Sequence, residues 1–226
     1  MEIANFPPEQ YFDLSAYRHK ELFDGIQNVW EAFERLEAYL SRVIEAVPLE
    51  KRRAGEIREG AKLYGHNIVI EEGAMVESTA YIRGPVWIGK KAKVGPGAFI
   101  RGPVVTGENC IIGNSTEARN TIMLNGSEAS HFNYIGDSIM GSGATLGAGT
   151  ALANTKINGK PVRIGMMDTG LARFGAVLAD GVRIGCNAVT DPGIIINKGC
   201  LILPLTYLRS GVYEQGEEKF TVRKIL

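Results

Sequence analysis

The sequence predicts a mainly β fold, a parallel β-helix of six-residue repeats preceded by an α-helical segment. Three observations support this: a period of six from residue 70 onward, an apolar seam with helical spacing between residues 20 and 47, and a composition rich in glycine. Glycine occurs 28 times, whereas aromatic side chains make up only 8% of the chain. The core must therefore consist mainly of Ile, Val, Leu and Ala, with turns at frequent intervals.

An amphipathic helix is predicted over residues 20–47. Its apolar positions alternate between spacings of four and three, which places them on one helical face. They are Leu22, Ile26, Val29, Phe33, Leu36, Leu40, Val43 and Val47. Pro48 then ends the helix. Two destinations stay open for this face, packing against the rest of the chain or a short coiled coil. The charged stretch 50–62 is either a linker or a second short helix.

From residue 70 the period of the aliphatic residues changes to six. The positions are Ile70, Val76, Ile82, Ile88, Val94, Ile100, Thr106 and Ile112. A small residue follows each of them four positions later, as at Ala74 and Ala92. Neither an α-helix nor an alternating strand has this period, whereas a coil of three short strands and three turns does. The aliphatic residue is expected to point inward, and the small residue to fit the tight corner.

The predicted organisation is a helical segment at 1–62, a β-helix at 63–208 and a tail at 209–226. Three features interrupt the repeat. Residues 118–134 lose the aliphatic spacing, the register shifts by one position at 135–141, and a polar, basic loop occupies 155–171. Loops that project from a rigid solenoid are where function usually lies, so these interruptions are the first places to look for a site.

One coil comprises three of the six-residue repeats, so Arg83, Arg101 and Arg119 are predicted to stack on successive coils about 4.8 Å apart. Like charges at this distance repel each other unless an anion or a carboxylate bridges them. The column is therefore interpreted as a phosphate site, a role that suits the forked donors of arginine. The alternative is a solvated ladder of side chains that fan apart.

His131 is the candidate catalytic residue, because it lies where the repeat is broken. It follows Arg119 by two repeats, or two-thirds of a coil, and so is expected around a corner from the arginine column. An imidazole pKa near 6.5 suits a general base at neutral pH. His19 and His66 are interpreted as structural.

Composition excludes several other functions. Lys and Arg number 25, as do Asp and Glu, so no overall charge attracts nucleic acid or a membrane surface. No apolar run approaches the roughly 18 residues of a membrane span, and no signal peptide is visible. Three cysteines without a CxxC pair favour reduced thiols in the cytoplasm over disulfides or zinc. No metal site is expected, and a three-histidine carbonic anhydrase site is set aside because only His66 and His131 lie in or beside the β-helix.

The stretch 130–154, S-H-F-N-Y-I-G-D-S-I-M-G-S-G-A-T-L-G-A-G-T-A-L-A-N, resembles the acetyltransferase domain of the bifunctional sugar-1-phosphate nucleotidyltransferases. The best-known members are the bacterial glucosamine-1-phosphate acetyltransferase/uridylyltransferases. The similarity covers roughly residues 82–205, and the combination H-x-x-Y-x-G-D with G-A-G-T is specific. It implies a left-handed β-helix, whose hand cannot be read from the period itself. The sequence contains no Gly-rich nucleotide-binding loop of the kind that the pyrophosphorylase domain of these bifunctional enzymes carries.

The resemblance also implies roles for individual residues. His131 matches the general base. The positions that bind the acceptor match Arg101, Arg119, Tyr134, Asn154, Lys160 and Glu117. The positions that contact coenzyme A match Ala148, Cys186 and Pro204. This sequence departs from the family pattern at Thr145, where Asn is typical, and at the last two coenzyme A positions, which are often Ser and Ala.

The expected activity is acetyl transfer from acetyl-CoA to the amine of a hexosamine 1-phosphate, with no metal. By the same resemblance the protein is expected to form a homotrimer in the cytoplasm, without nucleic acid or membrane partners. Two alternatives stay open. The acceptor could be another amino sugar, such as a nucleotide-linked one, or a hydroxyl. The protein could instead be a trimeric scaffold that does no catalysis.

Overall fold

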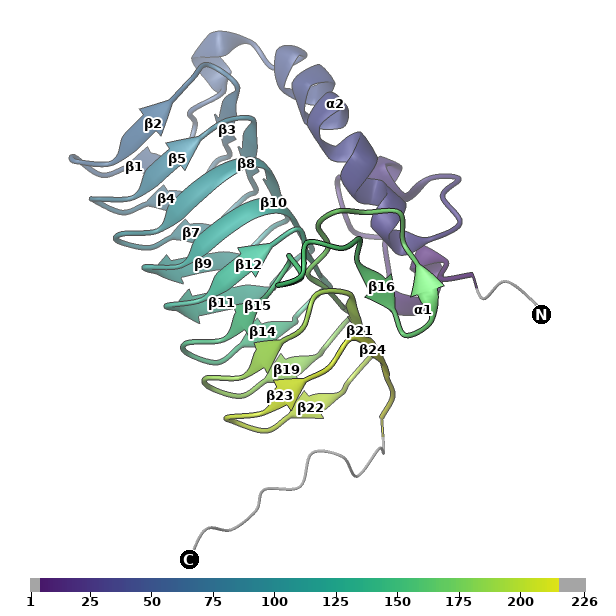
Figure 1. The fold of residues 1–226 in the computed structure, drawn as a ribbon. Coiled ribbons are helices and arrows are strands. Elements are labelled where there is room, and N and C mark those ends of the chain that lie inside the picture. Colours follow the sequence, from purple (N-terminus) through teal and green to yellow (C-terminus); the bar gives the residue numbers. More distant parts are fainter. Residues whose placement is uncertain (1–4, 216–226) are drawn as a thin grey trace, which may run out of the picture.

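The computed structural model describes residues 5–215 and contains a parallel β-helix with an N-terminal segment along one side (Figure 1). Short strands stack coil upon coil into three flat faces, and every ladder between coils is parallel. Two of the faces join into one 14-stranded sheet because β8 (Phe99–Thr106) and β10 (Glu117–Met123) bend around the corner between them. The predicted β-helix is confirmed.

The first face carries the outward residues discussed below. It consists of β2 (Lys62–Tyr64), β5 (Tyr81–Arg83), the first halves of β8 and β10, β12 (Tyr134–Gly136), β15 (Ala151–Leu152), β20 (Val189–Thr190) and β23 (Tyr207–Leu208). The second face consists of β3 (Ile68–Ile70), β6 (Val86–Ile88), the second halves of β8 and β10, β13 (Ile139–Met140), β18 (Ala176–Leu178), β21 (Ile194–Ile196) and β24 (Gly211–Tyr213).

The third face is a separate eight-stranded sheet. Its strands are β1 (Glu56–Ile57), β4 (Met75–Val76), β7 (Lys93–Val94), β9 (Ile111–Asn114), β11 (Glu128–His131), β14 (Thr145–Leu146), β19 (Arg183–Ile184) and β22 (Leu201–Ile202). The coils thus begin inside the segment 1–62 that was predicted to be helical or a linker. They extend into the predicted tail 209–226, of which residues 216–226 lie outside the described part of the chain.

The interior of the prism contains the predicted aliphatic column. Ile70, Ile82, Ile88 and Ile100 are completely buried, and the small corner residues such as Ala80 are buried as well. Burying one aliphatic side chain of this size contributes roughly 1.5–3 kcal/mol, so the repeated column supplies most of the driving force for coiling. Cys110 and Cys200 lie in the same small corner positions and are buried, without a disulfide.

One corner of the prism is a single position shorter than the repeat predicts. Arg101 pairs with Arg119, one full coil later, but Val104 pairs with Thr121 instead of Ile122. Asn120 therefore makes the turn alone, and it does so in the left-handed region with a φ of 44°. Asp137, on the next coil, repeats this geometry with a φ of 47°. Asn and Asp tolerate this conformation better than other side chains. The shortened corner explains the register shift of one position in the sequence.

The N-terminal helix is shorter than predicted, and the expectation of a helix over residues 20–47 was wrong at its start. The segment contains α1 (Pro8–Tyr11), the 3-10 helices η1 (Lys20–Phe23) and η2 (Val29–Glu31), the main helix α2 (Ala32–Glu45) and the 3-10 helix η3 (Leu49–Lys51). Gly25, with a φ of 68°, breaks the helical conformation after η1. Asn28 and Glu31 then form a capping box, which fixes a new helical start.

The apolar face of α2 packs against the β-helix of its own chain, along β6, β8 and β10 (Figure 1). Phe33, Leu36, Leu40 and Ile44 are all buried there. Of the two destinations left open by the sequence, packing within the chain is confirmed, since the seam that would form a coiled coil is already covered.

Residues 11–18 form a strap that crosses several coils. At one end Asp180 N donates to Tyr11 O at 3.1 Å, and Asp13 N donates to the Asp180 carboxylate at 2.7 Å. At the other end Arg18 pairs with Glu71 at 3.1 Å. Its guanidinium carbon lies 5.0 Å from the centre of the Trp87 ring. The strap therefore ties late coils to early ones.

The loop at 155–171 contains a small antiparallel hairpin, β16 (Arg163–Ile164) and β17 (Met167–Asp168). After the loop, the buried Phe174 packs against Trp30 and Phe33, with 5.9 Å between ring centres in each case. The chain that leaves the loop is thus packed against the N-terminal segment. No helix in residues 5–215 is long and apolar enough to cross a membrane.

His19 makes the docking of the strap sensitive to pH. Burial, with a smaller contribution from the charge of Arg18, lowers the pKa of His19 to about 3. Its Nδ1 lies 3.0 Å from the hydroxyl of Tyr39, and its ring centre lies 5.0 Å from that of Trp87. In the unfolded chain the imidazole has an ordinary pKa near 6.5. Below pH 6.5 the unfolded state therefore gains a proton that the folded state does not, and stability is lost as the pH falls toward 3.

We predict that the free energy of unfolding is lower at pH 5 than at pH 7 by about 2 kcal/mol because of His19 alone. Denaturant unfolding followed by tryptophan fluorescence measures this, since both tryptophans, Trp30 and Trp87, are buried in or beside the N-terminal segment. The variant His19→Gln should lose this part of the pH dependence. An equal pH dependence in the variant would contradict the assignment.

Candidate functional site

The predicted catalytic and coenzyme A residues lie in one column along the corner between the third and first faces. The register of β11, β14, β19 and β22 continues into this corner. There Gly149 N donates to His131 O at 3.0 Å, Asn187 N to Ala148 O at 2.8 Å and Leu205 N to Cys186 O at 2.9 Å. His131, Ala148, Cys186 and Pro204 are thus at equivalent positions on successive coils, spaced by about 4.8 Å per coil. We call these four residues the corner column.

His131 ends β11 and is exposed to solvent. A rigid turn follows it. The side-chain oxygen of Asn133 accepts a hydrogen bond from His131 N at 3.1 Å, and Asn133 Nδ2 donates to Gly147 O at 2.7 Å. Because Asn133 is buried, it fixes the backbone of His131 relative to the next coil. The sequence reasoning missed Asn133, although it stands inside the quoted motif.

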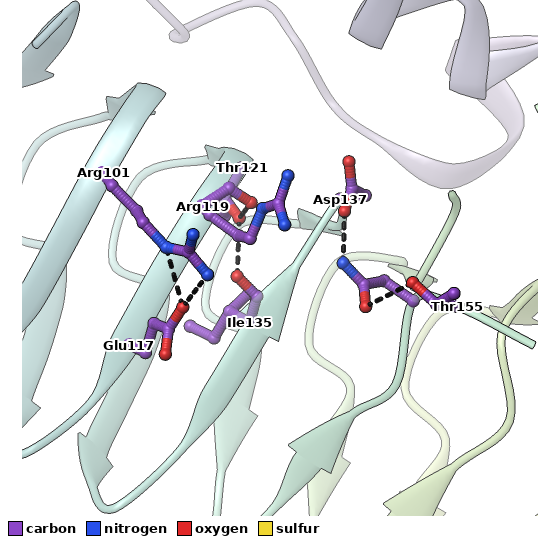
Figure 2. A network of polar contacts seen from close by, with 8 residues as sticks. Arg101, Glu117, Arg119, Thr121, Ile135, Asp137 and Thr155 are labelled. Carbon is purple, nitrogen blue, oxygen red and sulfur yellow. Dashed lines mark hydrogen bonds and ion pairs between the residues drawn. The ribbon is translucent and has the colours of Figure 1, made fainter. Parts of the chain in front are cut away.

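The arginine column exists as predicted on the first face. Arg83 pairs in register with Arg101, and Arg101 with Arg119. One carboxylate meets this column: Arg101 Nε and Nη2 both donate to the same oxygen of Glu117, at 2.9 and 2.5 Å (Figure 2). The pair is partly exposed, so it contributes little to stability and chiefly orients the two side chains.

A second column of residues runs beside the arginine column on the first face. In it Tyr134 lies one coil after Glu117, since the two residues pair in register. The strand then leaves room for the tyrosine ring, because Arg119 is followed on the next coil by Gly136. A Cβ on Gly136 would lie 2.7 Å from the Tyr134 hydroxyl and 2.6 Å from Asn154 Nδ2. The phenol and the carboxamide therefore converge over the backbone of Gly136.

A buried carboxylate holds Asn154. One oxygen of Asp137 accepts a hydrogen bond from Asn120 Nδ2 at 2.7 Å. Its other oxygen accepts one from Asn154 Nδ2 (Figure 2). Asn154 Oδ1 accepts a hydrogen bond from the Thr155 hydroxyl at 3.3 Å. Asn120 and Asp137 form a ladder with Asn154 at the shortened corner. Of these three residues, the sequence analysis assigned only Asn154 to the site. The sequence contains two signals that point to this ladder: Asp137 in the H-x-x-Y-x-G-D motif, and the loss of one position from the six-residue repeat.

Lys160 lies on the inserted loop and not on the strands that carry the arginine column. It is exposed on the inserted loop, where its backbone N–H donates to Asn158 Oδ1 at 3.1 Å, and its side chain makes no ion pair within residues 5–215. The loop borders a cavity of about 480 Å³ on the later coils of the first face. Its walls include Lys156 and Ile157 from the loop and Asp191 and Tyr207 from the coils.

We predict that Gly136→Ala lowers the free energy of unfolding by about 1–3 kcal/mol, because the added methyl group collides with Tyr134 and Asn154. Urea denaturation measures the loss. In a Tyr134→Phe background the same substitution should cost less, since one of the two colliding atoms is gone. An unchanged cost in that background would show that the hydroxyl does not lie over Gly136.

The sequence of this chain is similar to several known proteins. Residues 82–167 match the family model described as the GMPPB C-terminal domain. A bifunctional sugar-1-phosphate nucleotidylyltransferase/acetyltransferase of Sulfurisphaera tokodaii is 33% identical over 154 residues, which cover 66% of this chain and 38% of that protein. The bifunctional protein GlmU of Methanococcus vannielii is 31% identical over 204 residues, 86% of this chain and 48% of that protein.

The solved structure of a hexapeptide transferase family protein from Anaplasma phagocytophilum covers 72% of this chain and 78% of its own, at 20% identity and a TM-score of 0.24. That score is too low to add to the fold seen directly. The two curated relatives align over most of the β-helix, and this chain spans less than half of the length of each. This chain is a hexapeptide-repeat β-helix protein, and its sequence is similar to part of the bifunctional sugar-1-phosphate nucleotidylyltransferase/acetyltransferases.

Proposed function

We propose that this protein transfers an acetyl group from acetyl-CoA to the amine of a hexosamine 1-phosphate. The observation that carries the proposal is the placement of the corner column beside the first face. A histidine and three predicted coenzyme A positions follow one edge of the prism, and the predicted acceptor positions Arg101, Glu117, Arg119 and Tyr134 project from the adjoining face.

The acceptor would lie on the first face with its phosphate toward the arginine column. Arg101 and Arg119 would donate charge-assisted hydrogen bonds to the phosphate, and Lys160 would complete its binding from the inserted loop. Tyr134, Glu117 and Asn154 would then orient the sugar. Because Asp137 engages the amide nitrogen of Asn154, the carboxamide presents its oxygen, which can accept an N–H from the acceptor amine.

In the proposed reaction His131 accepts a proton from the amine as the nitrogen attacks the thioester carbonyl. The carbonyl oxygen becomes an oxyanion in the tetrahedral intermediate. A backbone N–H near Ala148 would stabilise this oxyanion, an effect typically worth about 2.7–4 kcal/mol. Collapse of the intermediate breaks the carbon–sulfur bond, and the departing thiolate of coenzyme A takes up the proton. The product is the N-acetylated sugar phosphate.

Acetyl-CoA would extend along the corner column from His131 toward the later coils. Ala148, the exposed Cys186 and Pro204 mark successive coils on this path, so an extended thioester arm can contact each of them.

We place the protein in the cytoplasm, since all three of its cysteines are free thiols.

We predict that His131→Ala lowers kcat by roughly 10²–10⁴, the usual contribution of a general base. Acetyl-CoA consumption with glucosamine 1-phosphate and galactosamine 1-phosphate as acceptors measures this. His66→Ala is the matched control, since His66 is also exposed but lies away from the corner column. Turnover at the parent rate in a folded His131→Ala variant would remove His131 from the mechanism.

We further predict that the protein is a homotrimer, because the corner column is an open edge of the prism that a neighbouring prism would complete. Sedimentation velocity on the full chain measures the oligomeric state. A monomer with full acetyltransferase activity would show that one prism alone makes the whole site.

A further inference from the structure

The arginine column carries more positive charge than one phosphate requires. Glu117 pairs with Arg101, but neither Arg83 nor Arg119 forms an ion pair within residues 5–215. These two guanidiniums project from coils on either side of Arg101, with backbones about 10 Å apart. A single phosphate near Arg119 and Arg101 would not neutralise the positive charge of Arg83. A second phosphate, bound one coil earlier, would neutralise it.

A ladder of aromatic rings adjoins Arg83 on the same face. The rings of Tyr64 and Tyr81 are stacked, with centres 4.6 Å apart, and Tyr81 meets the edge of Phe99 at 5.2 Å. The guanidinium carbon of Arg101 lies 5.5 Å from the centre of the Phe99 ring. Tyr64, which pairs in register with Arg83, is 48% exposed. An exposed ring of this kind, directly beyond a row of guanidiniums, offers a surface on which a base can stack.

The direction of these features fits the acceptor proposed above. The amine must reach the coils of His131 and Asn154, and the sugar phosphate lies toward Arg119. Anything attached to that phosphate therefore extends toward the earlier coils, past Arg101 to Arg83 and Tyr64. The acetyl donor follows the corner column toward the later coils, so the two directions do not compete for space.

We propose that Arg83 and the Tyr64–Tyr81–Phe99 ladder bind the nucleoside diphosphate part of a nucleotide-linked amino sugar. Arg83 and Arg119 would hold the two phosphates, and Tyr64 would stack on the base. This inference rests on the proposed acetyl transfer, and it gives the acceptor as a nucleotide-linked amino sugar in place of a free hexosamine 1-phosphate. It also assigns a site to Arg83, whose side chain has no role in the reaction with a sugar 1-phosphate.

Isothermal titration calorimetry on the full chain tests the site without any acetyl transfer. The probes are UDP, GDP, ADP and dTDP, each compared with pyrophosphate and inorganic phosphate. At least one nucleoside diphosphate should bind about tenfold tighter than pyrophosphate, because the base adds stacking. Arg83→Ala and Tyr64→Ala should each raise its Kd by about tenfold or more, whereas Tyr64→Phe should retain binding. Lys93→Ala, which removes an exposed charge from the third face, should leave the Kd unchanged.

Three outcomes would overturn the proposal. The first would be that no nucleoside diphosphate binds to the parent protein. The second would be that the Arg83→Ala variant binds the nucleoside diphosphate with the Kd of the parent. Alternatively, the Tyr64 and Arg83 variants change the sedimentation coefficient but not the Kd, which would make the ladder a contact between copies of this chain. Acetylation of a sugar 1-phosphate without nucleotide binding would retain the proposed function and reject this site. Nucleotide binding that depends on Arg83, without acetyl transfer to any amino sugar, would do the reverse.

Discussion

Parallel hydrogen bonding between coils is the constraint on which the rest of this structure depends. The strands of each coil form hydrogen bonds with the strands of the adjacent coil, so residues that are one coil apart in the sequence become neighbours in space. The core column of Ile and Val and the arginine column both follow from this rule. The same rule aligns His131 with Ala148, Cys186 and Pro204, although these residues are far apart in the sequence. Chemical groups in such a prism are positioned by the backbone and need few side-chain contacts to hold them.

The period of six was sufficient to predict the coils, the buried aliphatic positions and the stacking of Arg83, Arg101 and Arg119, because these depend only on local spacing. The N-terminal segment shows where local pattern fails. Leu22, Ile26 and Val29 have helical spacing and are indeed buried, yet they lie in 3-10 turns or irregular chain. Contact with the β-helix, Gly25 and the capping box at Asn28 override the periodicity there. Such tertiary effects leave no periodic signal.

The candidate site was also only partly predictable. Arg101 and Arg119 could be placed from the repeat alone, whereas Glu117 and Tyr134 were assigned to the site by the resemblance. Asn120 and Asp137 could not be placed, since their role arises from a corner that is one position too short. That corner turns two side chains toward each other and so creates the buried ladder to Asn154. Lys160 lies on an insertion outside the repeat, where spacing carries no information about position. The loop that carries it borders the later coils, and Phe174, just after the loop, packs against Trp30 and Phe33.

The strap at residues 11–18 has a consequence for how the chain is made. The hydrogen bond between Asp13 and Asp180 spans 167 residues, and Trp30 and Phe33 meet a partner, Phe174, that is synthesised far later than they are. On the ribosome the N-terminal segment emerges long before these partners exist, and its apolar side chains have no complete surface to cover them. The coils can assemble one after another as they are synthesised, each on the edge of the last. The N-terminal segment, synthesised before the coils that it covers, therefore completes its native contacts only after the late coils have formed. Until then the nascent chain exposes apolar side chains that are prone to aggregate.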